Sequence, residues 1–289
     1  FVDAGIPDGV INLVYGVPAD ISNYLIPHPI IKKISFTGST AVGKELASLA
    51  AQHMKLSTME LGGHAPAIVF NDADLTAALD VLTTQKFRNA GQVCVAPTRF
   101  LVQDELYEKF VDGYVKLAKE VKLGNGLDSS TSMGPLAHDR RLAAVEELVQ
   151  DAVDLGAKIH CGGQRPKNVG YFYPPTVLTG VPKSARMMNE EPFGPIIPIS
   201  SFKTVDEVLM EANRLPYGLS AYAYTASSET ADRVGREIES GIIGINHHGQ
   251  PAVETPFGGI QDSGQGKENG SEGLESYMHS KLISHKTTP

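Results

Sequence analysis

Short apolar, β-branched runs alternate with longer helical patterns along the chain, and this alternation constrains the fold more than any other feature. We predict strands over residues 30–36, 65–70, 100–102, 176–178, 196–202, 221–225 and 241–246. We predict helices from Ser39 or Thr40 to about residue 52, from Asp72 or Asp74 onward, over 106–121 and over 142–153. Such alternation is typical of an α/β fold with a mostly parallel sheet.

Charge, apolar run length and cysteine content indicate which partners and which cellular compartment to expect. The net charge is −8 and basic residues form no tract, which disfavours nucleic acid as a partner. Apolar runs stay shorter than the roughly 20 residues of a membrane span, so we expect no membrane partner. The two cysteines form no disulfide framework, which indicates a reducing compartment.

Cys94 is the candidate nucleophile. It ends the run Phe-Arg-Asn-Ala-Gly-Gln-Val-Cys, in a Gly-containing turn that we place between two helix-like stretches. A helix N-terminus would favour the thiolate, and the backbone N–H of Cys94 would donate to the oxyanion formed on attack. The alternative is a small buried hydrophobic residue.

Glu60 is the candidate general base, 34 positions before Cys94. Its apolar neighbours Met59 and Leu61 predict partial burial, which raises the pKa of a carboxyl and makes it a better base. The glycines at 62 and 63 permit close backbone approach. The alternative is an ordinary solvated glutamate at the end of a strand.

The segment from Gly38 to Gly43 follows a predicted strand and opens a predicted helix. Glycines allow a tight turn there, and a helix N-terminus holds an anionic phosphate. It is a relaxed form of the dinucleotide fingerprint, with Thr40 in place of the second glycine. Many ordinary strand–helix turns share this pattern.

Five motifs in order, over essentially all 289 residues, resemble the aldehyde dehydrogenase superfamily. They are Phe-Thr-Gly-Ser-Thr-Ala-Val-Gly at 36–43, Met-Glu-Leu-Gly-Gly at 59–63, the run ending at Cys94, Glu-Glu-Pro-Phe-Gly-Pro at 190–195 and Pro-Phe-Gly-Gly at 256–259. The resemblance implies a parallel-sheet catalytic domain at 63–262, the rear of a Rossmann-like nucleotide-binding domain at 1–62, and a tail with an oligomerisation strand at 263–289.

The resemblance also implies site residues. NAD or NADP would contact Gly38, Ser39, Gly43 and Leu61, with Ser39 at the pyrophosphate. Glu191 would hold the nicotinamide ribose, and Phe193 would border the nicotinamide; their alternative is a surface turn anchored by Phe193. Phe257 would line the aldehyde tunnel or simply pack in the core.

Family members extend further at the N-terminus, so we expect the first part of the nucleotide domain, with any targeting segment, to be missing here. The ribose-contacting Lys and the Asn of the oxyanion site match no residue of this sequence. Family members are dimers or tetramers, and residues 277–285 would supply a strand to a neighbouring subunit. The compartment would be the cytoplasm, or the mitochondrial matrix in a eukaryote.

Other reactive side chains give weaker indications of a function. The adjacent His247 and His248 have no third metal ligand at a useful spacing, so we expect no metal site. We assign both histidines to a solvated loop, from which one of them could contact a polar or anionic substrate. Cys161 has no base near it in sequence, and we expect a structural role.

The leading hypothesis is NAD(P)-dependent oxidation of an aldehyde through a thioester on Cys94. The segments at 60–66 and 87–92 resemble the semialdehyde branch, which implies a carboxylated substrate such as succinate semialdehyde. Three alternatives stay open: an acylating enzyme that uses coenzyme A, which the presence of Glu60 disfavours; a cysteine-dependent ester hydrolase; and a truncated, catalytically inactive chain.

Overall fold

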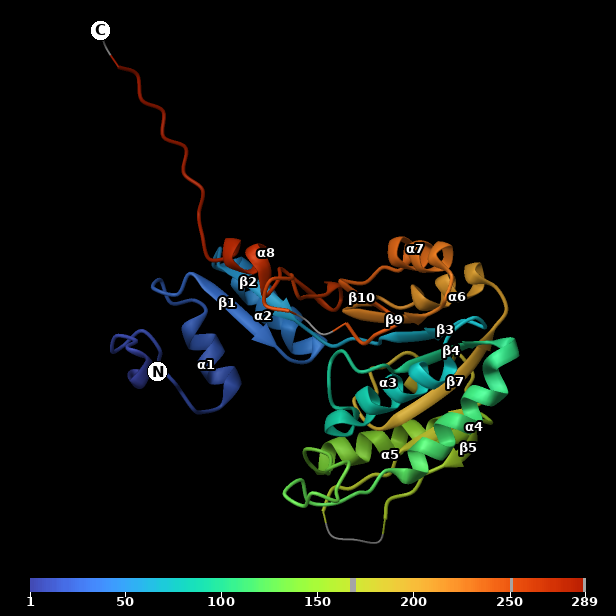
Figure 1. Cartoon of the computed structure of the whole chain (residues 1–289). Helices are drawn as coiled ribbons and strands as arrows, with labels where there is room; N and C mark the ends of the chain where they lie inside the picture. The colour runs from blue at the N-terminus through green and yellow to red at the C-terminus, as the bar shows by residue number, and fades with distance from the viewer. Residues whose placement is uncertain (167–169, 250–251, 288–289) are drawn as a thin grey trace.

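The computed structural model describes residues 1–166, 170–249 and 252–287, which form two main sheets (Figure 1). The larger sheet has seven strands in the order β10-β9-β3-β4-β7-β6-β5, all paired in parallel except β5 with β6. The smaller sheet has the order β1-β2-β12, with β1 and β2 parallel and β12 antiparallel to β2. The predicted α/β class with a mostly parallel sheet is therefore confirmed.

Some helices cover the two faces of the larger sheet, and others lie beside the smaller sheet (Figure 1). The α-helices are α1 Pro18–Leu25, α2 Thr40–Gln52, α3 Leu75–Phe87, α4 Asp104–Glu120, α5 Asp139–Asp154, α6 Val205–Ala212, α7 Ser228–Glu237 and α8 Gly270–Glu275. Short 3-10 turns are η1 Val2–Ala4, η2 Arg88–Gly91 and η3 Arg186–Met188.

The strands are short, as expected for buried parallel strands. They are β1 Lys33–Thr37, β2 Leu56–Glu60, β3 Pro66–Val69, β4 Arg99–Gln103, β5 Lys158–Cys161, β6 Thr176–Thr179, β7 Ile196–Phe202, β8 Tyr217–Gly218, β9 Ser220–Tyr224, β10 Ile242–Ile245, β11 Ile260–Gln261 and β12 Gly264–Gln265. The two-residue strands β8 and β11 pair antiparallel with each other.

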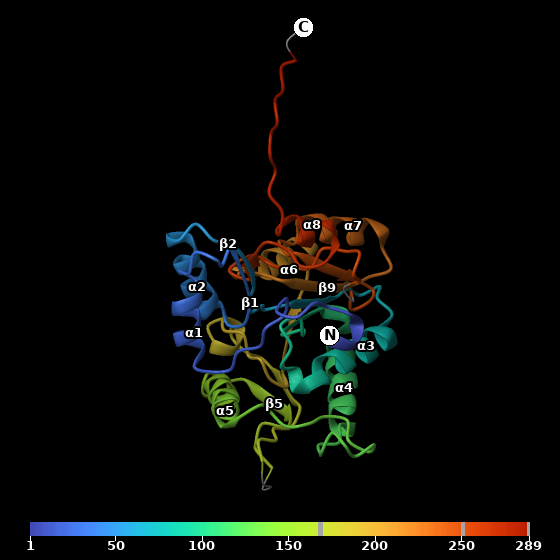
Figure 2. The same cartoon turned by 90° about the vertical axis from the view of Figure 1, so that its left-hand side faces the viewer.

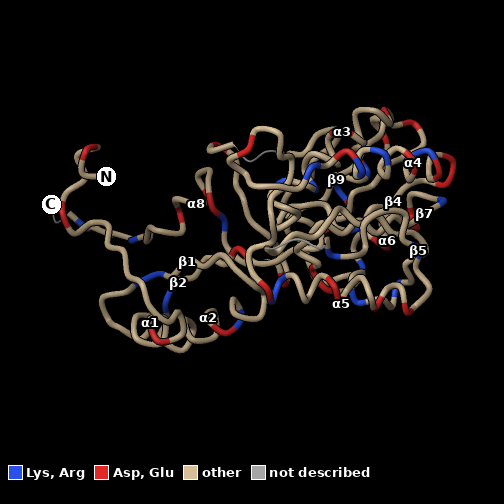
Figure 3. Tube along the Cα trace, turned by 90° about the horizontal axis from the view of Figure 1, so that it is seen from below, with Lys and Arg blue, Asp and Glu red and all other residues tan. Residues whose placement is uncertain are grey.

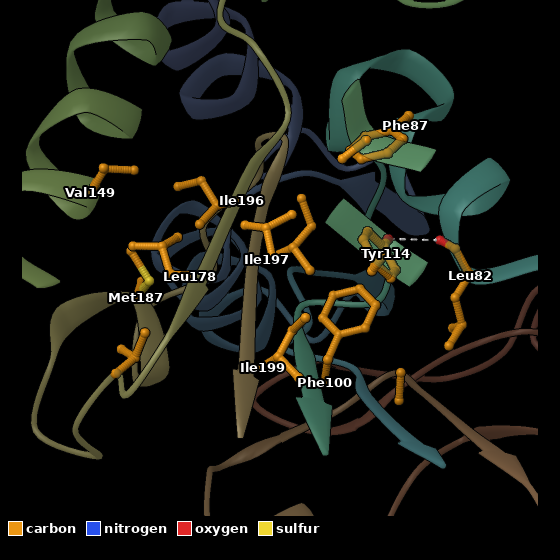
Figure 4. Close-up of a cluster of buried hydrophobic side chains, with 14 of the residues drawn as sticks. Leu82, Phe87, Phe100, Tyr114, Val149, Leu178, Met187, Ile196, Ile197 and Ile199 are labelled. Carbon is orange, nitrogen blue, oxygen red and sulfur yellow. Dashed lines mark hydrogen bonds between the residues drawn. The ribbon is translucent and has the colours of Figure 1, made fainter. Parts of the chain in front are cut away.

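Period-two alternation divides the core of the larger sheet into two layers. On β4, Phe100 and Val102 face one layer, with Tyr114 of α4 and Val149 of α5, whereas Leu101 faces the other. The second layer contains residues of α6 and α7. Figure 4 shows the first layer, including the hydrogen bond from the Tyr114 hydroxyl to the Leu82 carbonyl. Both faces are buried, so the strands lack polar alternation.

Side-chain caps begin several helices where the sequence places polar residues. Asp74 caps α3 by accepting from the N–H of Ala77 at 3.0 Å. Asp72 instead accepts from the Thr225 hydroxyl and the Ala226 N–H, and so ties the start of α3 to the end of β9. Ser39 precedes α2 but makes no side-chain cap bond.

Most predicted elements are confirmed, with boundary shifts. The strand at 196–202 and the helix end at Gln52 are placed correctly, whereas β1 begins at Lys33 and not at residue 30. The prediction missed β2 and β5, which are short and carry polar residues.

The strand predicted at 277–285 is not formed within the described part of the chain itself. Residues 278–287 are extended, exposed and unpaired, and they project from the body as a tail in both views (Figures 1 and 2). A strand requires a hydrogen-bonded neighbour, and the described part of the chain supplies none here. Whether another subunit supplies one stays a prediction.

The surface carries both signs of charge. Acidic and basic residues are interspersed along the trace (Figure 3). Among the described residues, no helix has both the length and the apolar character of a membrane span.

Candidate active site

Cys94 lies in a turn that follows a strained loop. Asn89, Ala90 and Gly91 have φ values of 50°, 55° and 73°, in the left-handed region that non-glycine residues rarely adopt. A side chain on Gly91 would collide with the carbonyl of Gly194, so this loop packs directly on the segment that follows Glu191. Backbone strain held by such packing is common at functional sites.

The predicted helical environment of Cys94 was wrong on its C-terminal side. After the turn the chain enters β4 at Arg99, so the thiol does not lie at a helix N-terminus. Burial, Glu191 and Glu60 raise the pKa of the Cys94 thiol, while hydrogen bonds from the backbone of Cys94 and Val95 oppose this rise. The strand cannot supply the dipole that a helix would have given.

The Gly62–Gly63 loop brings the candidate residues together. The N–H of Gly63 donates to Glu191 Oε1 at 3.1 Å, and a Cβ on Gly62 would collide with Glu191 Oε2. A Cβ on Gly63 would lie 3.0 Å from the carbonyl oxygen of Cys94. Because Glu60 ends the strand that leads into this loop, three predicted site residues meet around two glycines.

Glu60 is buried, with 4% of its surface exposed, and neither carboxylate oxygen has a hydrogen-bond partner within the described residues. Burial, followed by the nearby charge of Glu268, raises the pKa of Glu60 to about 8, and Lys267 opposes this rise. A Cβ on Gly258 would lie 2.5 Å from Glu60 Oε1, so the segment after Phe257 covers the carboxyl. The predicted burial and raised pKa are confirmed; the catalytic role stays a prediction.

The Gly38–Gly43 turn lies beside this loop. The N–H of Gly38 donates to the carbonyl of Glu60 at 3.1 Å, and the Leu61 side chain fills the space beside Gly43. Ser39 is exposed at the N-terminus of α2 with its hydroxyl uncommitted to a cap.

A cavity of about 990 Å³ lies between α1, β1 and α2, and Pro18, Val42 and Leu46 are among the apolar residues that line it. Nucleotide sites combine these two features, an apolar cavity and an open helix N-terminus.

Phe193 and Phe257 occupy the expected loops. Phe193 has a φ of 39° and lies 5.8 Å from the guanidinium carbon of Arg141. Phe257 is half-buried and exchanges two backbone hydrogen bonds with Glu268, each of 2.7 Å. Their predicted contacts with nicotinamide and aldehyde stay predictions.

The histidine pair is only partly in a solvated loop. His247 is exposed, but His248 stacks on the ring of Tyr222 at 4.5 Å, and the Tyr222 hydroxyl donates to the carbonyl of Val95, next to Cys94. Burial, Arg88 and His247 lower the pKa of His248 to about 4, so this imidazole is neutral near pH 7. His248 therefore does not supply a cation near pH 7.

Sequence reasoning missed three charged residues of this region. Lys86 is fully buried on α3, and its ammonium has no hydrogen-bond partner in the described parts of the chain; burial lowers its pKa to about 7, while Glu191 opposes the shift. Glu268 acts on Glu60 as described above. Arg88 is exposed, six positions before Cys94, and makes no ion pair with the described residues. Arg88 lies in the segment at 87–92 that resembles the semialdehyde branch, and this resemblance was the signal that could have indicated it.

Cys161 is half-buried at the end of β5, with its sulfur 3.8 Å from the carbonyl oxygen of Pro175, and burial raises the pKa of its thiol. Within the described ranges, no group of three or more His, Cys, Asp or Glu side chains is arranged to hold a metal ion.

Comparison with known proteins gives a consistent set of similarities. The model described as "Aldehyde dehydrogenase family" matches residues 1–283. The chain is 43% identical over 278 residues to 4-(hydroxymethyl)benzenesulfonate dehydrogenase of Comamonas testosteroni, covering 96% of this chain and 58% of the relative. It is 41% identical over 282 residues to the NADP(+) succinate-semialdehyde dehydrogenase of Escherichia coli, covering 98% and 58%.

Solved structures agree. The succinate-semialdehyde dehydrogenase of Burkholderia pseudomallei superposes with a TM-score of 0.93 at 39% identity, over 96% of this chain and 57% of that one. The chain therefore spans a little more than half the length of the relatives that it matches.

Proposed function

The chain belongs to the aldehyde dehydrogenase family, and on that premise we propose that the protein oxidises an aldehyde to a carboxylic acid with NAD(P)+ through a thioester on Cys94. The observation that carries this proposal is the meeting of Cys94, Glu60 and Glu191 around Gly62–Gly63. A thiol with a buried carboxyl nearby is the pair of groups that covalent catalysis followed by hydrolysis requires.

In the first half-reaction, the Cys94 sulfur forms a bond to the aldehyde carbon and the carbonyl oxygen becomes an oxyanion. A bound nicotinamide would accept the hydride that leaves this carbon, and the carbonyl re-forms as a thioester. The pKa of the resting thiol is raised by burial and by the charges of Glu191 and Glu60. Its ionisation therefore requires a group that accepts the proton, or a loss of these charges when cofactor or substrate binds.

In the second half-reaction, Glu60 removes a proton from water as the water oxygen attacks the thioester carbon. The carbon–sulfur bond then breaks, which releases the carboxylic acid and restores the thiol. The pKa of about 8 makes Glu60 a far stronger base than an exposed carboxylate while leaving a usable ionised fraction near neutral pH. The presence of Glu60 favours hydrolysis over transfer to coenzyme A, because a buried carboxyl base is suited to the activation of water.

The described residues fit a dinucleotide. The open N-terminus of α2, with Ser39 uncapped, would hold the pyrophosphate, and the apolar cavity beside Val42 and Leu46 would hold the adenosine. Glu191, held by the Gly63 N–H, would accept from the nicotinamide ribose hydroxyls.

We propose that the aldehyde carries an anionic group. The compounds named for two relatives support this class, since succinate semialdehyde carries a carboxylate and 4-(hydroxymethyl)benzenesulfonate carries a sulfonate. We assign Arg88 as the cation that pairs with such a group, because it lies on the loop before Cys94 and near His248. Arg binds planar oxyanions in a bidentate manner.

We further propose the division into residues 1–62, 63–262 and 263–289, with assembly into dimers or tetramers. The break between the two sheets supports the first boundary, because β2 ends at Glu60 and β3 begins at Pro66. The return of β12 to β2 supports the second boundary.

The test is oxidation of succinate semialdehyde and butanal by the purified protein, followed as NAD(P)H formation. We expect turnover that requires the nicotinamide and a preference for the charged aldehyde, with Cys94→Ala inactive and Cys161→Ala active as the matched control. Oxidation by Cys94→Ala at the unsubstituted rate would overturn the proposal.

A further inference from the structure

His64 links the three segments that carry the candidate catalytic residues. It follows Gly63 directly, it is 2% exposed, and both ring nitrogens are engaged. Nδ1 lies 2.8 Å from the hydroxyl of Thr98, four positions after Cys94. Nε2 lies 3.1 Å from the carbonyl oxygen of Met187, four positions before Glu191.

The partners define the tautomer of His64. A carbonyl oxygen only accepts, so Nε2 carries the proton that binds Met187. Nδ1 of the neutral ring then accepts from the Thr98 hydroxyl, for which the carbonyl oxygen of Ala65 at 3.2 Å is a second, longer acceptor. Burial and the nearby charge of Arg99 hold the pKa of His64 well below its usual value, so the ring stays neutral. The neutral ring can therefore satisfy one donor and one acceptor on different segments at once.

Further hydrogen bonds connect the same segments that the His64 ring joins. The segment from Met187 to Glu191 is tied to the Gly63–His64 dipeptide at both ends, through the His64 ring at one end and the Gly63 N–H at the other. The Cys94–Thr98 turn is tied to the same region, because the carbonyl of Ala65 accepts from the N–H of Thr98 at 3.0 Å. Arg99 fixes the backbone of His64 by donating to its carbonyl at 3.1 Å.

We propose that His64 is a positioning residue that sets the spacing of Cys94, Glu60 and Glu191 through these two hydrogen bonds. The Met187 bond holds the Glu191 carboxylate at Gly63, where it would meet the nicotinamide ribose. The Thr98 bond holds the turn that presents the Cys94 thiol. This role rests on the proposed function. The competing explanation is a core histidine whose hydrogen bonds serve stability alone.

Two substitutions separate the links, because an Asn amide overlays the Nδ1 position of histidine and a Gln amide overlays the Nε2 position. His64→Asn keeps a partner for Thr98 and loses the bond to Met187. His64→Gln keeps a donor to Met187 and loses the bond to Thr98. We expect Asn to raise the KM for NAD(P)+ about tenfold with the aldehyde KM little changed, and Gln to slow the pre-steady-state burst of NAD(P)H about tenfold with the cofactor KM little changed.

Thr98→Val gives an independent route to the second link, since it removes the hydroxyl while keeping the shape of the side chain. We expect it to reproduce the slow burst of His64→Gln. If Asn and Gln change both parameters alike, or if the variants lower only the midpoint of thermal unfolding, the positioning role is overturned. If the unsubstituted protein shows no NAD(P)+-dependent turnover, the proposed function fails and the positioning role with it, whereas normal turnover with unsplit kinetics overturns His64 alone.

Discussion

Replacing Glu60 by Gln should remove a pH-dependent loss of stability while it abolishes hydrolysis of the thioester. A buried carboxyl with no hydrogen-bond partner is costly to ionise, and its pKa rises from 4.5 to about 8 in the folded state. Between these two pKa values the folded protein binds more protons than the unfolded chain. Stability therefore falls as the pH rises from about 4.5 towards about 8.

The size of the effect follows from the two pKa values. Ionisation of Glu60 in the unfolded state destabilises the folded protein by about 1 kcal/mol at pH 5 and by about 3 kcal/mol at pH 7. A Gln side chain removes this term but brings its own unpaired amide, whose cost does not depend on pH. The difference in unfolding free energy between the Glu60→Gln variant and the unsubstituted protein should therefore grow by about 2.5 kcal/mol from pH 5 to pH 7.

Urea unfolding at both pH values, monitored by fluorescence and circular dichroism, measures this difference directly. Glu120→Gln, which changes an exposed carboxylate at the end of α4, gives the background for one lost surface charge. An equal difference at pH 5 and pH 7 would refute the claim that Glu60 is held in its protonated form by burial.

Three further results are expected. Glu268→Gln should lower the pH at which thioester hydrolysis rises, because Glu268 raises the pKa of Glu60, and Lys267→Met should raise that pH, because Lys267 lowers the pKa. The pH–rate profiles of the two variants measure these shifts, and shifts of the same sign would contradict this prediction. Arg88→Met should raise the KM for succinate semialdehyde roughly 10- to 100-fold and leave butanal unaffected, since a charged hydrogen bond contributes about 1.5–3 kcal/mol; equal effects on both aldehydes would exclude Arg88 as the anion site. Arg99→Met should lower the unfolding free energy, measured by urea unfolding, by about 3–5 kcal/mol. The reason is that this fully buried guanidinium donates to the carbonyls of His64, Glu211 and Ala212. A loss below about 1 kcal/mol would contradict that role.

Local patterns allowed most of the fold to be predicted because most of its strands and helices carry a signal in their own residues. The run at 196–202 is apolar and β-branched over its buried length, and Asp74 supplies its own cap. The strand at 158–161 gave no such signal, since it is short, partly polar and stabilised by pairing with β6. Tertiary pairing of this kind overrides local propensity.

The site was predictable as a set of motifs but not as an arrangement. The burial of Glu60 followed from its apolar neighbours, and the strand predicted at 100–102 is β4, whereas the residues around Cys94 wrongly indicated a helix-like stretch directly after it. The environment of Lys86 and the hydrogen bonds of His64 depend on contacts between segments more than 30 positions apart. Contacts at such separations are set by topology, and the local sequence does not record them.

The most direct test of the central claim is the intact mass of the protein after it is mixed with NAD(P)+ and succinate semialdehyde and quenched in acid. With Glu60→Gln, we predict that the protein accumulates one succinyl adduct, which peptide mapping places on Cys94, because the thioester forms but water is not activated. No adduct in Glu60→Gln, or an adduct that persists in the double variant with Cys94→Ala, would contradict the account.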